Sequence, residues 1–179
     1  MKEAKKMTGE ARRAFILKSL RETQEPITGT AFAKKANVSR QVIVQDVSLL
    51  KAKNEPIIAT SQGYMYMKEQ LDNALKRLVI ACKHTPEQTR EELNIIVDHG
   101  VTVKDVKIEH AVYGDLTASI MVSNRKEVDQ FIGKIEETNA SYLAPLTDGI
   151  HLHTLEADSE NKIDAACKAL AEANILLSD

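Results

Sequence analysis

The sequence changes character near residue 68, and this change limits the folds that the chain can adopt. Residues 1–68 contain 13 Lys and Arg against 6 Asp and Glu, a net charge of +7, whereas the remainder contains 11 against 20, a net charge of −9. A basic half joined to an acidic half predicts two modules, one that meets a polyanion and one with a different task. We expect the boundary near Lys68 to Leu71, with domains at 1–68 and 69–179.

The chain as a whole has the composition of an ordinary folded protein. Its 179 residues are 43% hydrophobic, enough for one generous domain or two small ones. No apolar run approaches the length of a membrane span, and no apolar segment of a signal peptide follows the charged N-terminus. We therefore expect a cytoplasmic protein without a membrane partner. Cys82 and Cys167 have no paired framework, which favours buried reduced thiols.

The basic half has the order of a helix-turn-helix. An amphipathic pattern predicts a first helix over 9–21, and Pro26 to Gly29 ends it. A short second helix over 30–36 ends at Asn37, a residue that tolerates the left-handed conformation. Ser39 is a good N-cap for a third helix over 40–52. A short helix, a tight turn and a longer helix are typical of proteins that read double-stranded DNA.

The third helix carries a set of outward residues suited to base recognition. Ile43, Val47 and Leu50 should pack on the first two helices, whereas Asp46 should pair with a nearby cation. Arg suits guanine, Gln suits adenine and a small apolar side chain suits the thymine methyl group. The alternative is a plain solvated helix face. The predicted DNA-binding residues are Ser39, Arg40, Gln41, Val44 and Gln45.

Two short strands around Ser61 to Gly63 follow the third helix and predict a wing. With the turn sequence Ala33 to Gln41, this order resembles the winged helix-turn-helix of repressors of the biotin-repressor type. Lys51, Lys53 and the wing could hold phosphates, which give affinity without sequence choice.

The acidic half predicts an α+β module. Its patterns indicate two early helices, a hairpin, a middle helix, a single strand and a last helix. Thr85 and Pro86 open the second of these helices, so His84 should lie in a corner between two helices. The expected ranges are helices at 69–83, 86–98, from Asn124 onward and 159–173, and strands at 101–112, 116–122 and 150–155.

Histidines on the single strand suggest a metal. His151 and His153 should share one face, roughly 6 to 7 Å apart along the strand. Imidazole suits Zn, Ni, Cu and Fe, but the pair alone is incomplete, and exposed or hydrogen-bonded histidines are the plainer interpretation. Glu91 and Glu92 lie within plausible reach of a metal held near His84. Cys82 is a rival by type, although on a helix it should point away from His84.

Motifs for other chemistry are missing from the sequence. It has no Walker loop, no Gly-rich dinucleotide turn, no nucleophile set beside a base and no His-Glu-x-x-His. We therefore do not expect an enzyme. One enzymatic alternative is a metal hydrolase that activates water at the histidine centre, although no general base accompanies it.

The two halves together resemble niacin-responsive transcriptional repressors, which join a winged helix-turn-helix to a three-histidine, or 3H, domain. The resemblance covers nearly the whole chain. It depends on the His84 corner, on Val106 to Thr117 around His110, and on Leu146 to Thr154 around His151 and His153. Ala111 departs from the family, in which proline is usual after this histidine.

The resemblance implies a set of site residues and ligands. A divalent transition metal, with Zn and Ni as leading candidates, would be bound by His84, Glu92, His151 and His153. Nicotinic acid would act as corepressor for genes of NAD synthesis and niacin salvage. His110 would bind the corepressor, orient a ligand or bind the metal directly. A homodimer would match the half-sites of an operator, and the alternative is a repressor for which the metal itself is the signal.

Overall fold

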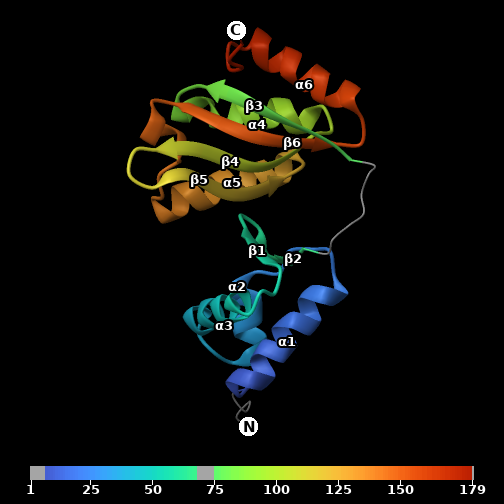
Figure 1. The fold of residues 1–179 in the computed structure, drawn as a ribbon, viewed down its shortest axis with the longest axis vertical. Coiled ribbons are helices and arrows are strands. Elements are labelled where there is room, and N and C mark those ends of the chain that lie inside the picture. The colour runs from blue at the N-terminus through green and yellow to red at the C-terminus, as the bar shows by residue number, and fades with distance from the viewer. Residues whose placement is uncertain (1–6, 68–74, 179) are drawn as a thin grey trace. The chain divides into compact units, whose positions relative to one another are not determined.

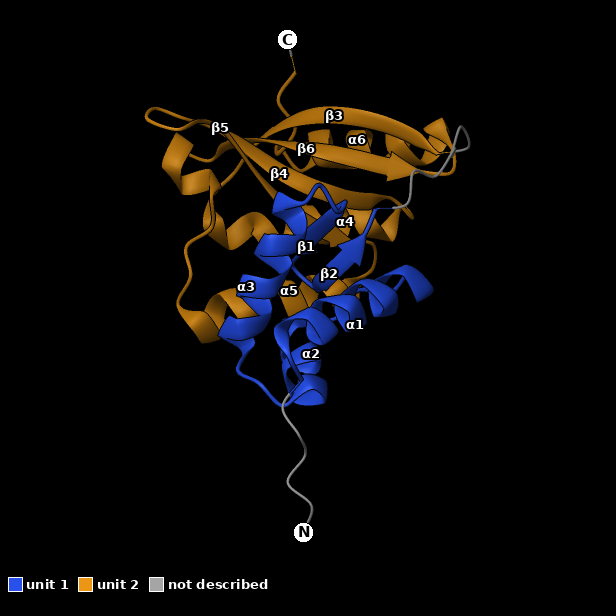
Figure 2. Cartoon of the chain, turned by 60° about the horizontal axis from the view of Figure 1, so that its bottom comes forward, with its two compact units in different colours: residues 1–71 blue, residues 72–179 orange. Residues whose placement is uncertain are grey.

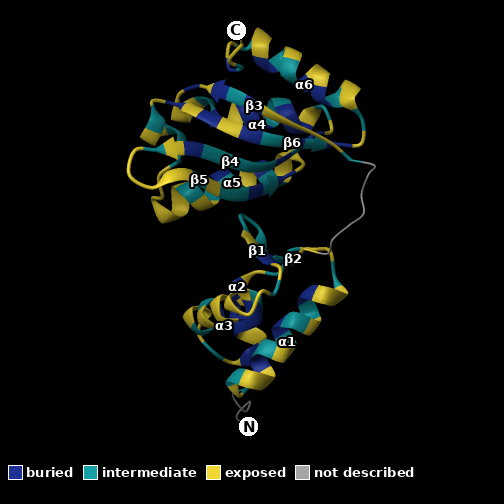
Figure 3. Ribbon diagram, in the orientation of Figure 1, coloured by how far each residue is buried: buried dark blue, intermediate teal, exposed yellow. Residues whose placement is uncertain are grey.

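The protein forms two compact units, residues 1–71 and 72–179 (Figure 1, Figure 2). The structure is a computed structural model, and it describes residues 7–67 and 75–178. The expected boundary near Lys68 to Leu71 lies outside the described residues. Each unit has its own cluster of buried apolar side chains (Figure 3). No helix in the described ranges is long and apolar enough to cross a membrane.

Unit 1 contains three helices in the predicted order. They are α1 (Gly9–Glu22), α2 (Gly29–Ala36) and α3 (Arg40–Ala52). The hydroxyl groups of Thr28 and Ser39 accept hydrogen bonds from backbone N–H groups in the first turns of α2 and α3. Asn37 ends α2 at a φ of 53°. The side-chain caps and the left-handed residue thus fix the tight turn, and the predicted helix-turn-helix order is confirmed.

The wing follows α3 as a hairpin of β1 (Ile57–Thr60) and β2 (Gly63–Tyr66). Tyr64 pairs with Ile27, just before α2, through two backbone hydrogen bonds of 2.8 and 3.0 Å. Its half of the hairpin is therefore anchored to the helices. The core of the unit includes Ile16, Leu20, Phe32, Ile43, Val47 and Leu50.

One charged side chain of α1 is buried against α3. Arg12 is only 8% exposed, and its guanidinium donates to the buried carboxylate of Asp46 on α3. Arg13 donates to the other oxygen of Asp46 at 3.2 Å. Arg12 is buried because the buried carboxylate of the neighbouring helix requires a cation. The expected pairing of Asp46 is confirmed.

Unit 2 is a four-stranded antiparallel sheet with helices on one face. The strand order is β3-β6-β4-β5. Helices α4, α5 and α6 contribute to the same buried cluster as the strands. The strands are β3 (Lys76–Lys83), β4 (Thr102–His110), β5 (Gly114–Val122) and β6 (Ile150–Ala157), and the helices are α4 (Thr89–Asp98), α5 (Arg125–Thr138) and α6 (Glu160–Glu172), with short 3-10 turns η1 (Pro86–Gln88) and η2 (Ala144–Thr147).

The alternation along β6 decides where its histidines lie. His151, His153, Leu155 and Ala157 are buried, whereas Ile150 is 45% and Leu152 is 39% exposed. Successive side chains of a strand point to opposite faces, so both histidines face the helices. The prediction that they share a face is confirmed, and that face is the buried one.

The helix predicted over 69–83 is wrong for its second half, where residues 76–83 form β3. This segment pairs with β6 along its whole length, from Lys76 opposite Ala157 to Lys83 opposite Ile150. Leu78 and Val79, which would lie on the apolar side of such a helix, are 42% and 52% exposed. Pairing with a neighbouring strand overrides the local helical spacing. His84 therefore lies in a corner between a strand and a helical segment rather than between two helices.

Candidate metal centre

Three histidines from two distant segments face one carboxylate inside unit 2. The Nε2 atom of His84 lies 2.7 Å from Oε2 of Glu92, and the Nε2 atom of His153 lies 3.2 Å from the same oxygen. The Nε2 atom of His151 lies 3.1 Å from Oε1. All four side chains are at most 3% exposed. The structure thus brings together the four residues predicted as metal ligands.

Each imidazole is oriented by a backbone carbonyl on its other nitrogen. His84 Nδ1 lies 2.7 Å from the oxygen of Thr85, His151 Nδ1 lies 2.9 Å from that of Gly149, and His153 Nδ1 lies 2.6 Å from that of Asp105. A carbonyl only accepts hydrogen bonds, so the proton of each neutral ring must be on Nδ1. Each Nε2 then presents a lone pair toward the centre, which is the state that binds a metal.

The local fold explains this orientation. Thr85 begins a capping box with Gln88, which turns the chain sharply after His84 and starts the segment that leads to Glu92 on α4. Gly149 has a φ of +85°, and a Cβ there would lie 2.3 Å from the carbonyl oxygen of His84. A β-bulge between Val103 and Asp105 accompanies the contact of the Asp105 carbonyl with His153.

Charge inside this cluster has to be balanced by protons or by a cation. Burial raises the pKa of Glu92, but the charge of His153 and hydrogen bonds from the three rings outweigh it and hold that pKa well below its ordinary value. Burial lowers the pKa of His84 and of His153, but the contact with Glu92 outweighs burial and raises both. Without a metal, protons on Nε2 therefore compensate the buried carboxylate.

The donor set fits a divalent transition metal. Donor atoms of a tetrahedral zinc site lie about 3.3 Å apart, because each bond to nitrogen or oxygen is about 2.0 to 2.2 Å long. The distances from the three Nε2 atoms to the Glu92 oxygens, 2.7 to 3.2 Å, are close to this spacing. Three neutral imidazoles and one carboxylate also leave a divalent ion with one positive charge.

Cys82 lies beside this cluster, contrary to the prediction that it points away. Its sulfur, a nitrogen of His151 and an oxygen of Glu92 lie within 4.8 Å of one another. Burial, followed by the charge of Glu92, raises the pKa of the Cys82 thiol. The prediction was wrong because it assumed a helix. On strand β3, Cys82 is directly opposite His151, and paired residues lie on the same face.

A cavity of about 210 Å³ opens beside the cluster. His84, Glu92, His151 and His153 form its polar end, and the remaining wall is largely apolar. Among the described residues that line it, none is Lys or Arg. The cavity is smaller than the roughly 300 Å³ at which sites for drug-sized ligands begin, so it suits a molecule of one small ring. The remaining lining residues are Thr89, Leu93, Val106, Ala118, Ile120, Phe131, Ile135, Ser141, Tyr142, Leu143 and Ala144.

Comparison with known proteins identifies both units. The family model described as "3H domain" matches residues 77–179, and the one described as "HTH domain" matches residues 12–65. The chain is 63% identical over 181 residues to "Transcription repressor NadR" of Bacillus subtilis, with 100% of both chains covered. The chain belongs to the 3H-domain family of transcription repressors. It is 37% identical over 164 residues to "Probable transcription repressor NiaR" of Thermotoga maritima, with 92% of both chains covered.

This 3H-domain repressor is a DNA-binding regulator rather than an enzyme. In its HTH domain, Ser39, Arg40, Gln41 and Gln45 are exposed, and Val44 is half-buried. They occupy the start and the first turns of α3. The residues predicted to contact DNA are therefore accessible, and their contacts with bases stay a prediction.

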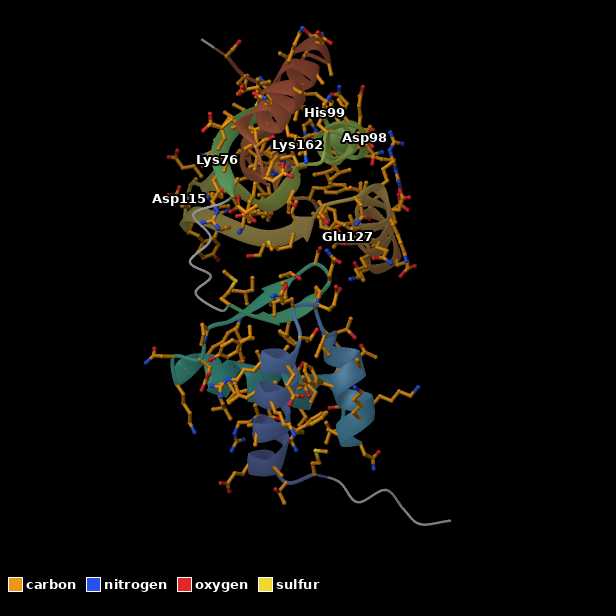
Figure 4. The ribbon with its side chains drawn as sticks, turned by 90° about the vertical axis from the view of Figure 1, so that its right-hand side faces the viewer. Lys76, Asp98, His99, Asp115, Glu127 and Lys162 are labelled. Carbon is orange, nitrogen blue, oxygen red and sulfur yellow. The ribbon has the colours of Figure 1, made fainter. Side chains whose placement is uncertain are left out.

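The two other histidines of the 3H domain lie outside the cluster. His110 is at the end of β4, where its Nδ1 accepts hydrogen bonds from the backbone N–H groups of Val112 and Tyr113 at 3.1 and 3.2 Å. It is not among the described residues that line the cavity. His99, labelled in Figure 4, ends α4. Its Nδ1 donates to the Ile95 carbonyl at 2.8 Å. These contacts stabilise a turn and a helix end, and binding of the corepressor by His110 stays a prediction.

Proposed function

We propose that this repressor controls genes of NAD synthesis and niacin salvage, with nicotinic acid as its corepressor. The observation that carries the proposal is the convergence of three Nε2 atoms on the buried Glu92, at one end of an apolar cavity. The resemblance to niacin-responsive repressors and the names of the two relatives support it. Cytoplasmic location follows from the same proposal.

We infer that His84, Glu92, His151 and His153 hold a divalent transition metal, with Zn and Ni as leading candidates. When bound, the metal supplies a positive charge that attracts an anionic group of a ligand. The carbonyls of Thr85, Gly149 and Asp105 keep the rings aimed at the centre. These hydrogen bonds reduce the cost of organising the site when the metal binds.

The cavity favours nicotinic acid for two reasons. Phe131, Tyr142 and aliphatic side chains offer apolar contacts to a flat ring. Because no Lys or Arg is among its described lining residues, the carboxylate of a ligand must be neutralised at the metal end. Nicotinamide lacks this charge and should bind more weakly. Calorimetric titration of the metal-loaded protein with both compounds tests this, and equal affinities would contradict the proposal.

The corepressor must favour the state of the protein that binds the operator, because equal affinity for two states shifts nothing. We propose a homodimer in which two α3 helices read the half-sites of double-stranded operator DNA through Ser39, Arg40, Gln41, Val44 and Gln45. Sedimentation of the ligand-free protein without DNA should give a dimer. A monomer at all accessible concentrations would count against a preformed pair.

A metal-responsive repressor is the second candidate, favoured by the same buried donor set. Footprinting of the operator with metal-loaded protein separates the two candidates. We expect protection to need nicotinic acid in addition to the metal. Full protection by the metal-loaded protein alone would favour the metal as signal.

A further inference from the structure

Cys82 has a position that the proposed four-donor centre does not use. It is 0% exposed, and it faces the same buried space as the metal-binding residues. Register pairs Cys82 with His151 across β3 and β6. Directly opposed side chains have Cβ atoms roughly 4.5 to 5.5 Å apart, so a small rotation of the thiol changes its distance to the centre.

The sulfur lies near two of the proposed metal ligands. A nitrogen of His151, an oxygen of Glu92 and the sulfur of Cys82 all lie within 4.8 Å of one another. Zinc–sulfur bonds are about 2.3 Å and zinc–nitrogen bonds about 2.0 Å, so a shared ion with a tetrahedral angle places the two atoms about 3.5 Å apart, and side-chain rotation must close the gap by up to about 1.3 Å. Cys82 is absent from the described lining of the cavity, whereas His151 and Glu92 belong to it.

We propose that Cys82 is a fifth donor to the metal while nicotinic acid is absent, and that the carboxylate of nicotinic acid replaces it. The inference rests on the metal centre of the proposed function. A divalent ion held by Glu92 and three neutral imidazoles has one uncompensated positive charge. One further anionic donor neutralises it, and a second adds a buried negative charge. The thiolate and the ligand carboxylate are therefore alternatives.

The exchange balances in protons. When sulfur binds the metal, the S–H bond breaks, a metal–sulfur bond forms and one proton leaves to solvent. When the carboxylate binds instead, the metal–sulfur bond breaks and the sulfur takes up one proton. Binding of nicotinic acid should therefore consume close to one proton per site, which titrations in buffers of different ionisation enthalpy measure.

Cobalt(II) provides the direct test, because its visible absorption reports binding and a near-ultraviolet band reports a cobalt–sulfur bond. We expect both signals in the full-length protein and in Cys167→Ser, a control at the half-buried second cysteine. Cys82→Ser should keep the visible bands and lose the near-ultraviolet band. Saturating nicotinic acid should remove that band from the unsubstituted protein, whereas nicotinamide should not.

The outcomes separate this inference from the proposed function. Visible bands without a near-ultraviolet band, before any ligand is added, would overturn sulfur binding and leave the four-donor centre intact. A near-ultraviolet band that persists with nicotinic acid bound, as verified by calorimetry in the same sample, would overturn the exchange. Absence of both bands would overturn the metal centre and this inference together. Circular dichroism of Cys82→Ser verifies that the variant is folded.

Discussion

The two domains each bury a carboxylate, and they neutralise it in different ways. In the HTH domain, Asp46 is 2% exposed and pairs with Arg12 and Arg13, which are charged at every accessible pH. In the 3H domain, Glu92 is 1% exposed and faces three imidazoles, and its carboxylate raises the pKa of His84 and of His153. The HTH domain thus balances its buried charge with its own arginines, whereas the buried charge of the 3H domain must be balanced by protons or by a metal.

The two domains also differ in the burial of the residues predicted to carry their functions. The residues predicted to contact DNA are exposed or half-buried on α3. Those predicted to bind the metal are buried among the apolar side chains of the sheet and its helices. The ion pairs of Asp46 keep the HTH domain in one state. The Glu92 cluster of the 3H domain can change its protonation or bind a metal, which is the property that a sensor needs.

The largest expected effect is on the permanent pair. Asp46→Ala should destabilise the HTH domain by about 3 to 5 kcal/mol, because it leaves Arg12 buried without its carboxylate. Hydrogen exchange of α1 and α3 amides in the full-length protein measures the loss. Glu22→Ala, which removes an exposed partner of Lys18, should change stability by less than about 0.5 kcal/mol. Unchanged exchange in Asp46→Ala would refute the role of the pair.

Removing the charge of Glu92, the second buried carboxylate, should instead lower the affinity for metal. Glu92→Gln should weaken zinc or nickel binding by more than about 100-fold, since a charged ligand is lost and not only its support. Competition with a coloured chelator measures this affinity. Glu91→Gln, at the exposed neighbouring position, is the matched control and should bind as the unsubstituted protein does. Equal affinities of the two variants would show that Glu92 is not a ligand.

Because the recognition residues are exposed, substituting them should change DNA binding without changing the stability of the HTH domain. Arg40→Ala should cost about 1 to 3 kcal/mol of operator affinity and relax specificity at one base pair. Lys51→Ala, at the other end of α3, should weaken binding to all sequences alike and reduce the salt dependence. Fluorescence anisotropy with operator and scrambled DNA at several salt concentrations distinguishes them. A uniform loss in Arg40→Ala would assign Arg40 to phosphate contact.

The stability of the metal-free 3H domain and its affinity for metal should depend on pH with opposite signs. The pKa values of His84 and His153 are raised above 6.5, so their contribution to stability is complete below pH 6.5 and is lost as pH rises through the raised values. Metal affinity should instead fall as pH falls, by about tenfold per pH unit for each proton that the metal displaces.

Thermal unfolding of the metal-free protein and metal titrations across about pH 6 to 8 test both trends. His99→Gln is the control, because its ring contacts the Ile95 carbonyl at the end of α4. Its pH profiles should match those of the unsubstituted protein. A metal affinity independent of pH would mean that no proton is displaced from the rings.

Local signals predicted the HTH domain because its elements are set by neighbouring residues. Ser39, Asn37 and the apolar spacing of α3 act over a few positions, and the structure confirms them. The burial of Arg12 escaped prediction, since it depends on Asp46, 34 positions away. Helical periodicity describes one element and cannot reveal a charge that a neighbouring helix buries.

Prediction of the 3H domain failed where long-range pairing decides the structure. The segment 76–83 has apolar residues at helical spacing, and only its partner β6 makes it a strand. That error also misplaced Cys82. The alternation of His151 and His153 was readable from the sequence, whereas their convergence with His84 and Glu92 came from resemblance to a family. The cavity depends on side chains from several elements and left no local pattern.

The close backbone approach at Gly149 makes this position sensitive to substitution. His84 and His151 come from segments that are distant in the chain, yet they meet where Gly149 passes the His84 carbonyl too closely for any side chain. A substitution of Gly149 would push the two segments apart, although His84, Glu92, His151 and His153 would all remain in the sequence. The convergence of His84 and His151 can therefore be lost through a substitution at a residue that has no side chain of its own in the cluster.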